Sequence, residues 1–217
     1  MVRPAPSLVS RAPSRAQVRR IGFTGDDPAL VEALRRGDPG APAALYDRYA
    51  AYLRRVLARV LGVDDELPEV LHETFAQALS SIDKLEDPQR LKGWMVRIAV
   101  FTARGTIRRR QRRRWLRFGA PHQIPELSTD PASAETKMTL ERVFVILDKM
   151  PTKERIPFTL RYLEGMQLTD VADAAGISLS SVKRQLGKAT KRFATLAKRD
   201  PLLRSWIESS PRFKDVT

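Results

Sequence analysis

Residues 168–193 read LTDVADAAGISLSSVKRQLGKATKRF, and this stretch contains two short amphipathic patterns separated by a glycine. The first pattern is centred on Val171, and Thr169 is a candidate cap for its helix. Gly176 permits the left-handed backbone of a tight turn, and Ser178 is a candidate cap for the helix that follows. The segment therefore predicts a helix-turn-helix.

The second helix of this segment has two chemically different sides. Val182, Leu186 and Phe193 recur at helical spacing and predict a buried side. The opposite side carries the candidates for contact with duplex DNA, which are Ser180, Ser181, Lys183, Arg184 and Lys188. Such a helix can enter the major groove and place its first turns against base edges and phosphates. A helical hairpin with a solvated basic face is the alternative interpretation.

The charge of the whole chain is concentrated in particular segments. The 217 residues include 39 Lys and Arg against 25 Asp and Glu, a formal net charge of +14. Residues 26–87 hold 7 basic and 13 acidic residues, whereas residues 88–125 hold 11 basic residues and no acid. The span 174–199 is also free of acids. Two separate basic surfaces on a chain that is otherwise balanced or acidic predict a polyanion partner.

The composition excludes several kinds of chemistry. The chain has no Cys, which excludes disulfides, thiolate metal sites and Cys nucleophiles, and its two histidines leave little for imidazole catalysis. No apolar run approaches the roughly 20 residues of a membrane span. No apolar signal-peptide stretch follows Met1. We therefore expect a soluble, cytoplasmic chain with no membrane insertion, no metal site and no other cofactor.

Upstream of the helix-turn-helix, apolar residues follow helical spacing rather than strand alternation. Caps and breakers predict helices from Asp27 to Gly37, from Pro39 to Gly62, from Glu66 to Ile82, and from Pro88 into an arginine run. On the fourth helix we expect Leu91, Trp94, Met95, Ile98, Phe101 and Thr102 on the inner side. A second group of helices starts near Ala134, with breaks at Met150–Pro151, Gly165 and Gly176. The fold class is all-α, with two small helical domains joined by a flexible linker.

The boundaries follow from changes in composition. Residues 1–25 contain three prolines and no apolar periodicity, which predicts a disordered basic tail, with a transit peptide as the less favoured alternative. Residues 26–117 form the first helical domain, and 118–135 are rich in proline and predict the linker. The helix-turn-helix domain spans 136–199, and 200–217 are a C-terminal extension with amphipathic spacing.

The second basic surface is the run 108–114, which has six arginines in seven residues. Such a run binds phosphates without sequence preference, and its affinity falls as salt rises. It continues a helix with further basic and aromatic residues, a combination that suits unpaired bases and their backbone. The candidates are Lys92, Trp94, Arg97, Arg104, Arg108, Arg109 and Arg112. Packing is the alternative role for Trp94, and a solvated surface is the alternative for the run.

The order of these features resembles the sigma factors of bacterial RNA polymerase, in the extracytoplasmic-function (ECF) group, over about residues 28–198. FTLRYLEGM at 158–166 and VADAAGISLSSVK at 171–183 are similar to the region 4 domain that recognises the minus-35 element. EVLHETF at 69–75 resembles the polymerase-docking helix of region 2. WMVRIA at 94–99, with the arginine run after it, resembles the helix that opens and binds the minus-10 element.

The resemblance implies a mechanism without catalysis by this chain. Core RNA polymerase would be bound through Glu69, Leu71, Glu73 and Phe75, with the two glutamates as polar contacts. The helix at 88–114 and the loop at 83–89 would capture an unstacked base of promoter DNA, and the second domain would hold the minus-35 duplex. An anti-sigma factor is a possible further partner. The polymerase performs nucleotidyl transfer, so the chain is not expected to be an enzyme.

Five positions depart from the family pattern, and one of them is Glu69, which stands where the family usually has Asp before the docking motif. Phe101 and Gly105 stand where the melting helix commonly has Asn and Asp, and Leu79 stands where Trp is frequent. Pro157 lies inside a helix of the second domain, where it must kink or shorten that helix.

Three other functions remain as alternatives. A helix-turn-helix regulator that is not a polymerase subunit would need neither the arginine run nor the docking motif. A di-iron enzyme would use a Glu and a His three residues apart on a helix, as at Glu69 and His72, but it needs a second copy of that pair. A basic protein that coats nucleic acid would bind every sequence equally and lose affinity steeply with salt.

Overall fold

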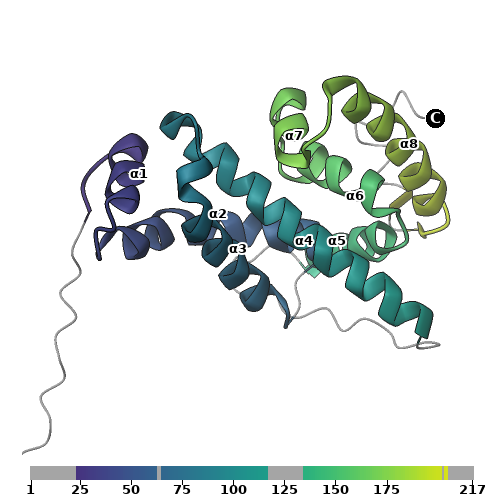
Figure 1. Cartoon of the computed structure of the whole chain (residues 1–217). Helices are drawn as coiled ribbons and strands as arrows, with labels where there is room; N and C mark the ends of the chain where they lie inside the picture. Colours follow the sequence, from purple (N-terminus) through teal and green to yellow (C-terminus); the bar gives the residue numbers. More distant parts are fainter. Residues whose placement is uncertain (1–22, 63–64, 117–133, 202, 205–217) are drawn as a thin grey trace, which may run out of the picture.

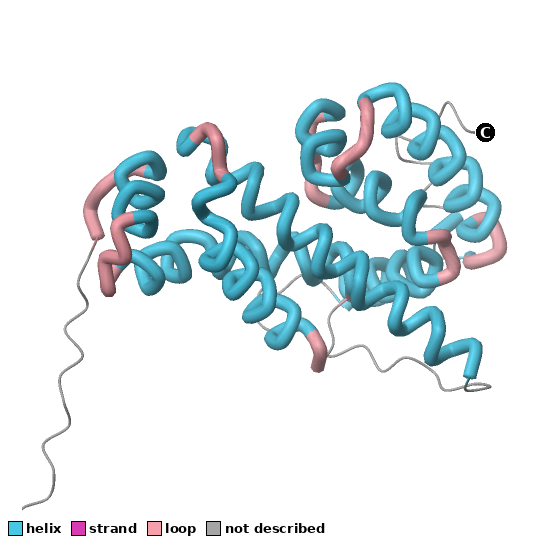
Figure 2. The backbone as a smooth tube through the Cα atoms, viewed as in Figure 1, coloured by secondary structure: helices cyan, strands magenta, loops and turns pink. Residues whose placement is uncertain are grey.

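The computed structural model describes residues 23–62, 65–116, 134–201 and 203–204, and every regular element in these ranges is helical (Figures 1 and 2). The main helices are α1 (Asp27–Arg35), α2 (Ala41–Leu61), α3 (Leu67–Ser81), α4 (Leu91–Leu116), α5 (Ala134–Asp148), α6 (Thr152–Phe158), α7 (Leu168–Ala175) and α8 (Leu179–Ala197). Short helical turns are η1 (Ile82–Lys84), η2 (Pro88–Arg90) and the π-helical η3 (Thr159–Leu163). The predicted all-α architecture is confirmed. The predicted tail at 1–25, linker at 118–135 and C-terminal extension lie largely outside the described residues.

Local sequence signals account for most helix boundaries. The carboxylate of Asp26 accepts a hydrogen bond from Ala29 N at 3.0 Å and caps α1. Asp87 accepts from Gln89 N at 3.0 Å and caps η2, which leads into α4. Gly62 ends α2 with a φ of 83°, a conformation that L side chains rarely adopt. These boundaries agree with the helices that the sequence predicts.

The first three helices and α4 share one apolar core. The predicted stripe on α2 is buried, with Leu45, Leu53 and Leu57 fully inaccessible, and it packs against α3 and α4. Leu91 and Met95 of α4 are also inaccessible. Burial of these side chains is the main stabilising contribution to such a bundle.

The prediction for Phe101 was wrong. Its side chain is 65% exposed, whereas Ala99, Val100 and Ala103 of the same helix are buried. The physical reason is that α4 is covered on more than one side, by α2 and α3 and also by the second group of helices. Small residues fill the close contacts of α4, and the bulky Phe101 ring remains at an open groove.

The second group of helices has an aromatic core. Phe158 of α6 stacks on Phe193 of α8 with ring centroids 4.7 Å apart, and both side chains are inaccessible or nearly so. Pro157 precedes this contact, and the helix changes after Phe158 into the π-helical turn η3, where Glu164 N donates to Thr159 O. The sequence predicted that Pro157 kinks or shortens its helix; the α-helical part ends one residue after Pro157, and the chain continues as the π-helical turn η3.

The two groups of helices pack directly against each other. In Figure 1, α4 runs diagonally across the molecule, with α1 to α3 on one side of it and α6 to α8 on the other. The contacts across this boundary join α4 to α7 and α6, and α2 to η3. The helix-turn-helix is therefore positioned over α4 rather than held away from it.

Candidate nucleic-acid interface

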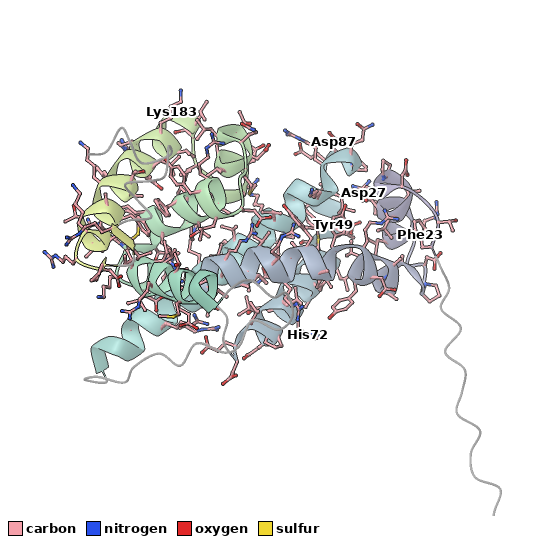
Figure 3. The ribbon with its side chains drawn as sticks, turned by 180° about the vertical axis from the view of Figure 1, so that it is seen from behind. Phe23, Asp27, Tyr49, His72, Asp87 and Lys183 are labelled. Atoms are coloured by element: carbon pink, nitrogen blue, oxygen red, sulfur yellow. The ribbon has the colours of Figure 1, made fainter. Side chains whose placement is uncertain are left out.

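The outer face of α8 is open along its first two turns. Ser180, Lys183, Arg184 and Lys188 are exposed, and Ser181 is half-buried. Figure 3 shows Lys183 at the outer edge of the molecule, projecting away from the other helices. The structure thus brings all five predicted residues for duplex DNA onto one accessible surface.

The start of α8 is fixed by its cap. Ser178 Oγ accepts a hydrogen bond from Ser181 N at 3.3 Å and lies 2.9 Å from Ser181 Oγ. Gly176 adopts the left-handed conformation, with φ 63° and ψ 40°, and this turn separates α7 from α8. Both features were predicted and are confirmed. A capped helix with free amides and basic side chains near its N-terminus is suited to phosphate contact.

The prediction that Thr169 caps α7 was wrong. The helix begins at Leu168, so Thr169 already lies inside it, and the N-cap residue is Gln167 without a side-chain hydrogen bond. Leu168 is partly buried against the core, and this packing starts the helix earlier than the threonine would.

The second basic surface lies along α4. Lys92, Arg97, Arg108, Arg109 and Arg112 are exposed. The Nη2 of Arg109 donates to Thr106 Oγ1 at 3.2 Å, which holds that side chain against the helix. Arg110 differs from its neighbours because it turns inward, where its Nε lies 3.0 Å from Glu66 and its Nη1 donates to Leu61 O at 2.9 Å. The arginine run therefore has both an exposed row and an anchoring member.

Trp94 and Arg104 occupy the boundary between the two helical groups. Trp94 is partly buried and packs against the core, as its alternative role predicted. Arg104 is half-buried, and its Nη2 donates to the carbonyl oxygen of Ala175 at 2.8 Å. Burial lowers the pKa of Arg104, and the nearby positive charge of Arg108 lowers it further. Both residues are thus held at the contact with α7 rather than spread on an open surface.

A pocket of about 340 Å³ lies between α4 and the turn after α7. Its lining is Gln77, Trp94, Arg97, Ile98, Phe101, Arg104, Ala174, Ala175 and Gly176. A flat aromatic surface beside two guanidinium groups can stack an unpaired base and bind its phosphate.

A second pocket of about 340 Å³ lies beside the loop that precedes α4. It is lined by Lys84, Leu85, Glu86, Asp87, Arg90, Gly93, Trp94, Arg97 and Asp173. Trp94 and Arg97 line both pockets, so the two openings share one aromatic and one basic side chain. This is the loop that the family resemblance associates with an unstacked base.

The docking motif on α3 divides into an outer and an inner pair. Glu69 and Glu73 are exposed, whereas Leu71 and Phe75 are each only 6% exposed and belong to the core. The Phe75 ring lies 4.9 Å from the ring of Tyr46, which is itself half exposed on α2. The accessible groups of this motif are the two glutamates and His72 between them.

Sequence reasoning missed the residues that join the two groups of helices. Glu164 is bound by Arg59 and lies 3.5 Å from Arg55, and Asp173 lies 3.5 Å from Arg90. These pairs join positions far apart in the chain, and no periodic pattern identifies them. The only available signal was the cluster of acids at 164–173, directly before the acid-free segment.

The described residues offer neither a cluster of metal ligands nor a membrane-spanning helix. No group of three or more His, Asp or Glu side chains among them could hold a metal ion, and Glu69 and His72 are both exposed. His72 lies on the outer side of the first group of helices in Figure 3. None of the helices in the described ranges is long and apolar enough to cross a membrane.

Comparison with known families and proteins matches both halves of the chain. The Sigma-70 region 2 model matches residues 45–113, and the Sigma-70 region 4 model matches residues 140–193, together more than half of the chain. The ECF RNA polymerase sigma-E factor of Haemophilus influenzae is 28% identical over 172 residues, which is 75% of this chain and 90% of that protein. Its counterpart in Escherichia coli K12 is 26% identical over 187 residues, 82% of this chain and 96% of that protein.

Solved structures share the fold. CnrH in complex with the cytosolic domain of CnrY has a TM-score of 0.56 at 23% identity, and the match covers 80% of this chain and 98% of CnrH. The sigma factor RpoE of Bartonella quintana, in complex with the anti-sigma factor NepR, has a TM-score of 0.54 at 19% identity, over 69% of this chain and 92% of RpoE. Because the two family models together match more than half of the chain, the chain belongs to the sigma-70 family, and its relatives make it a sigma factor of the ECF type.

Proposed function

We propose that this sigma factor uses three separate surfaces to bind core RNA polymerase, the separated strand and the duplex. The exposed glutamates of α3 contact core RNA polymerase, with Leu71 and Phe75 holding that helix in the core. The basic row of α4 and the loop before it bind the separated strand of the minus-10 element. The outer face of α8 holds the minus-35 duplex. Nucleotidyl transfer belongs to the polymerase, and we infer a cytoplasmic place of action for a chain that works on promoter DNA.

The observation that carries the proposal is that a single chain presents two basic helices with different surroundings. On α8 the basic groups lie beside hydroxyls on a smooth exposed face, which suits a duplex groove. On α4 the basic groups lie beside Trp94 and Phe101 at pockets, which suits unpaired bases. A helix-turn-helix regulator would need only the first of these, so the region 2 match favours the sigma factor.

The direct test is run-off transcription with purified core polymerase, with promoters recovered by selection and mapped by footprinting. We expect defined start sites that depend on this chain. The double variant Glu69→Ala with Glu73→Ala should lower transcription and binding to core enzyme while leaving duplex binding unchanged. Glu32→Ala is the matched control, because it removes an exposed glutamate from α1. A chain that binds duplex DNA specifically and never associates with core enzyme would refute the proposal.

An anti-sigma protein is a further partner that we include in the proposal. The support is the RpoE structure, in which a protein of the same fold is bound to NepR. The expected observation is a stable complex with such a protein that abolishes run-off transcription, whereas unchanged transcription in its presence would remove it from the list of partners.

A further inference from the structure

The loop between α3 and α4 combines one buried residue with exposed charged neighbours. The Leu85 side chain is only 4% exposed and belongs to the core, whereas Lys84, Glu86 and Asp87 are exposed. All four residues line the pocket that also contains Trp94. A base that enters this pocket therefore meets charged side chains whose positions depend on the backbone at Leu85.

Helix α1 holds that backbone from outside the loop. It packs against both short turns, η1 and η2, that flank the loop. Arg35, in the last turn of α1, donates from Nη2 to the carbonyl oxygen of Leu85, which lies 50 positions further along the chain. Its Nη1 donates to Glu32 at 3.2 Å. A carbonyl oxygen outside a regular helix needs a donor from another element, and Arg35 supplies it.

The other hydrogen bonds of the loop are local. Leu85 N donates to Ile82 O at 3.1 Å, and Arg90 N donates to Asp87 O at 3.0 Å. The Asp87 carboxylate accepts from Gln89 N at 3.0 Å. These bonds span two or three residues, so they shape each turn without fixing it against the rest of the protein. The bond from Arg35 connects the loop to a distant element.

Helix α1 is itself anchored where it begins. The carboxylate of Asp27 binds Arg48 at 2.8 Å and accepts a hydrogen bond from the hydroxyl of Tyr49, both on α2. Burial raises the pKa of Tyr49, and the bond to Asp27 raises it further, so the hydroxyl remains a donor. Figure 3 shows Asp27, Tyr49 and Asp87 at the same end of the molecule. A helix fixed to α2 in this way is a firm support for the loop.

We propose that Arg35 is a positioning residue for base selection, which fixes the loop at 83–87 beside the pocket for an unstacked base. The inference rests on the strand-binding function proposed for α4 and this loop. Arg35 acts through the carbonyl of Leu85 and does not itself contact DNA. Without its donors the loop adopts several conformations, while Trp94 and Arg97 stay on α4. Discrimination among bases then falls, and the attraction to phosphates remains.

The test measures base preference in single strands. The full chain selects its preferred strand from a random pool of single-stranded DNA of about 12 nucleotides. Affinities are then measured for that strand and for its single-base variants. Arg35→Met keeps a long side chain and removes the donors. The affinity ratio between the best and worst base at one position should fall by about three- to tenfold, a change typical of one lost hydrogen bond. Arg35→Lys, which retains one donor group, should recover part of the ratio.

Two control variants remove the same charge at other places. Arg36→Met changes an exposed neighbour of Arg35. Arg48→Met removes the pair with Asp27 and the hydrogen bond to Gly25 O, so it weakens the anchoring of α1 without a contact to the loop. Both controls should keep the base preference of the wild type. Urea denaturation shows whether Arg35→Met and Arg48→Met lose comparable stability.

Amide hydrogen exchange provides a readout that needs no DNA. In Arg35→Met, exchange should accelerate at the amides of Leu85 and Arg90, whose hydrogen bonds lie in the two turns. Exchange in the middle of α3 and α4 should not change. A general loss of stability would instead accelerate exchange throughout the first group of helices, and that result would overturn the inference.

The binding outcomes separate this inference from the function on which it rests. A lower base preference in Arg35→Met, with both controls unchanged, supports the positioning role. A preference equal to that of the wild type, or an equal loss in Arg48→Met, overturns it and leaves strand binding by α4 intact. If the wild type binds no single strand, or binds all strands equally, the proposed strand recognition and the inference fail together.

Discussion

Helices α4 and α8 have similar compositions, but they are packed differently. Each has an apolar side in a helical core and exposed basic residues, but α4 also lies between two layers of helices, and two of its arginines, Arg104 and Arg110, are partly buried there. The guanidinium of Arg184 is in solvent, while that of Arg104 is half-buried and bonded to Ala175 O. The difference teaches that basic composition does not by itself tell whether a basic side chain is exposed, because the packing of neighbouring helices decides its exposure.

The largest effect is expected from removing the support of α8. Phe158→Ala takes away a side chain that is 1% exposed and stacked on Phe193, which should cost about 3–5 kcal/mol of unfolding free energy. Duplex binding should be lost, while strand binding by α4 should remain. Urea denaturation and binding assays with duplex and with single-stranded DNA check this.

Phe101→Ala is the control for that prediction, since its ring is 65% exposed. Its unfolding free energy should change by no more than about 0.5 kcal/mol. If Phe158→Ala weakened strand binding as much as duplex binding, the two surfaces would not be separable.

The next effect is expected at the recognition surface. Arg184→Ala should weaken duplex binding by about 1–3 kcal/mol and relax base preference at one position, because an exposed guanidinium near the start of α8 is placed for base edges. Binding of single strands should not change. Arg199→Ala removes the same charge beyond α8, and an equal loss in both variants would mean that charge alone determines affinity.

A smaller effect is expected from the cap of α8. Ser178→Ala removes the acceptor for Ser181 N and should lower stability by about 1 kcal/mol. Amide hydrogen exchange should accelerate in the first turn of α8 and remain unchanged in α4. Ser80→Ala, at an exposed serine inside the last turn of α3, is the comparison, and identical exchange in both variants would contradict a capping role.

The smallest effect concerns the salt dependence of strand binding. Arg109→Ala removes one exposed phosphate contact, so the slope of log affinity against log salt should fall by about 0.7. The measurement is the affinity for a single-stranded oligonucleotide at a series of salt concentrations. Arg36→Ala, an exposed arginine after α1, should leave the slope unchanged. Equal changes would indicate a diffuse charge effect instead of a contact on α4.

The helix caps and turns that depend on a few neighbouring residues were predicted from the sequence. The cap Ser178 and the turn at Gly176 act within three or four residues, and both appear in the structure. The prediction for Thr169 failed because Leu168 packs into the core and starts the helix earlier. Local capping preferences are weak enough for one buried side chain to override them.

The sequence predicted which residues belong to the candidate site, but it did not predict the contacts that those residues make with distant parts of the chain. All five residues on α8 share one accessible face, as helical spacing predicts. Leu71 and Phe75 lie in the core, because a docking motif on an amphipathic helix includes its inward positions. The contact between Arg104 and Ala175 joins residues 71 positions apart, and no periodic pattern in one sequence contains that information.

Helix α4 is continuous over 26 residues, and this continuity fixes the distances between the basic residues along it. A helix of 26 residues measures about 39 Å, and the 15 steps along the helix from Arg97 to Arg112 span about 22 Å. At about 3.4 Å per nucleotide along one strand, that span corresponds to six or seven steps. Because a continuous helix keeps its length, we expect the fixed spacing between Arg97 and Arg112 to limit how much of a strand these two groups can follow, whatever bases that strand contains.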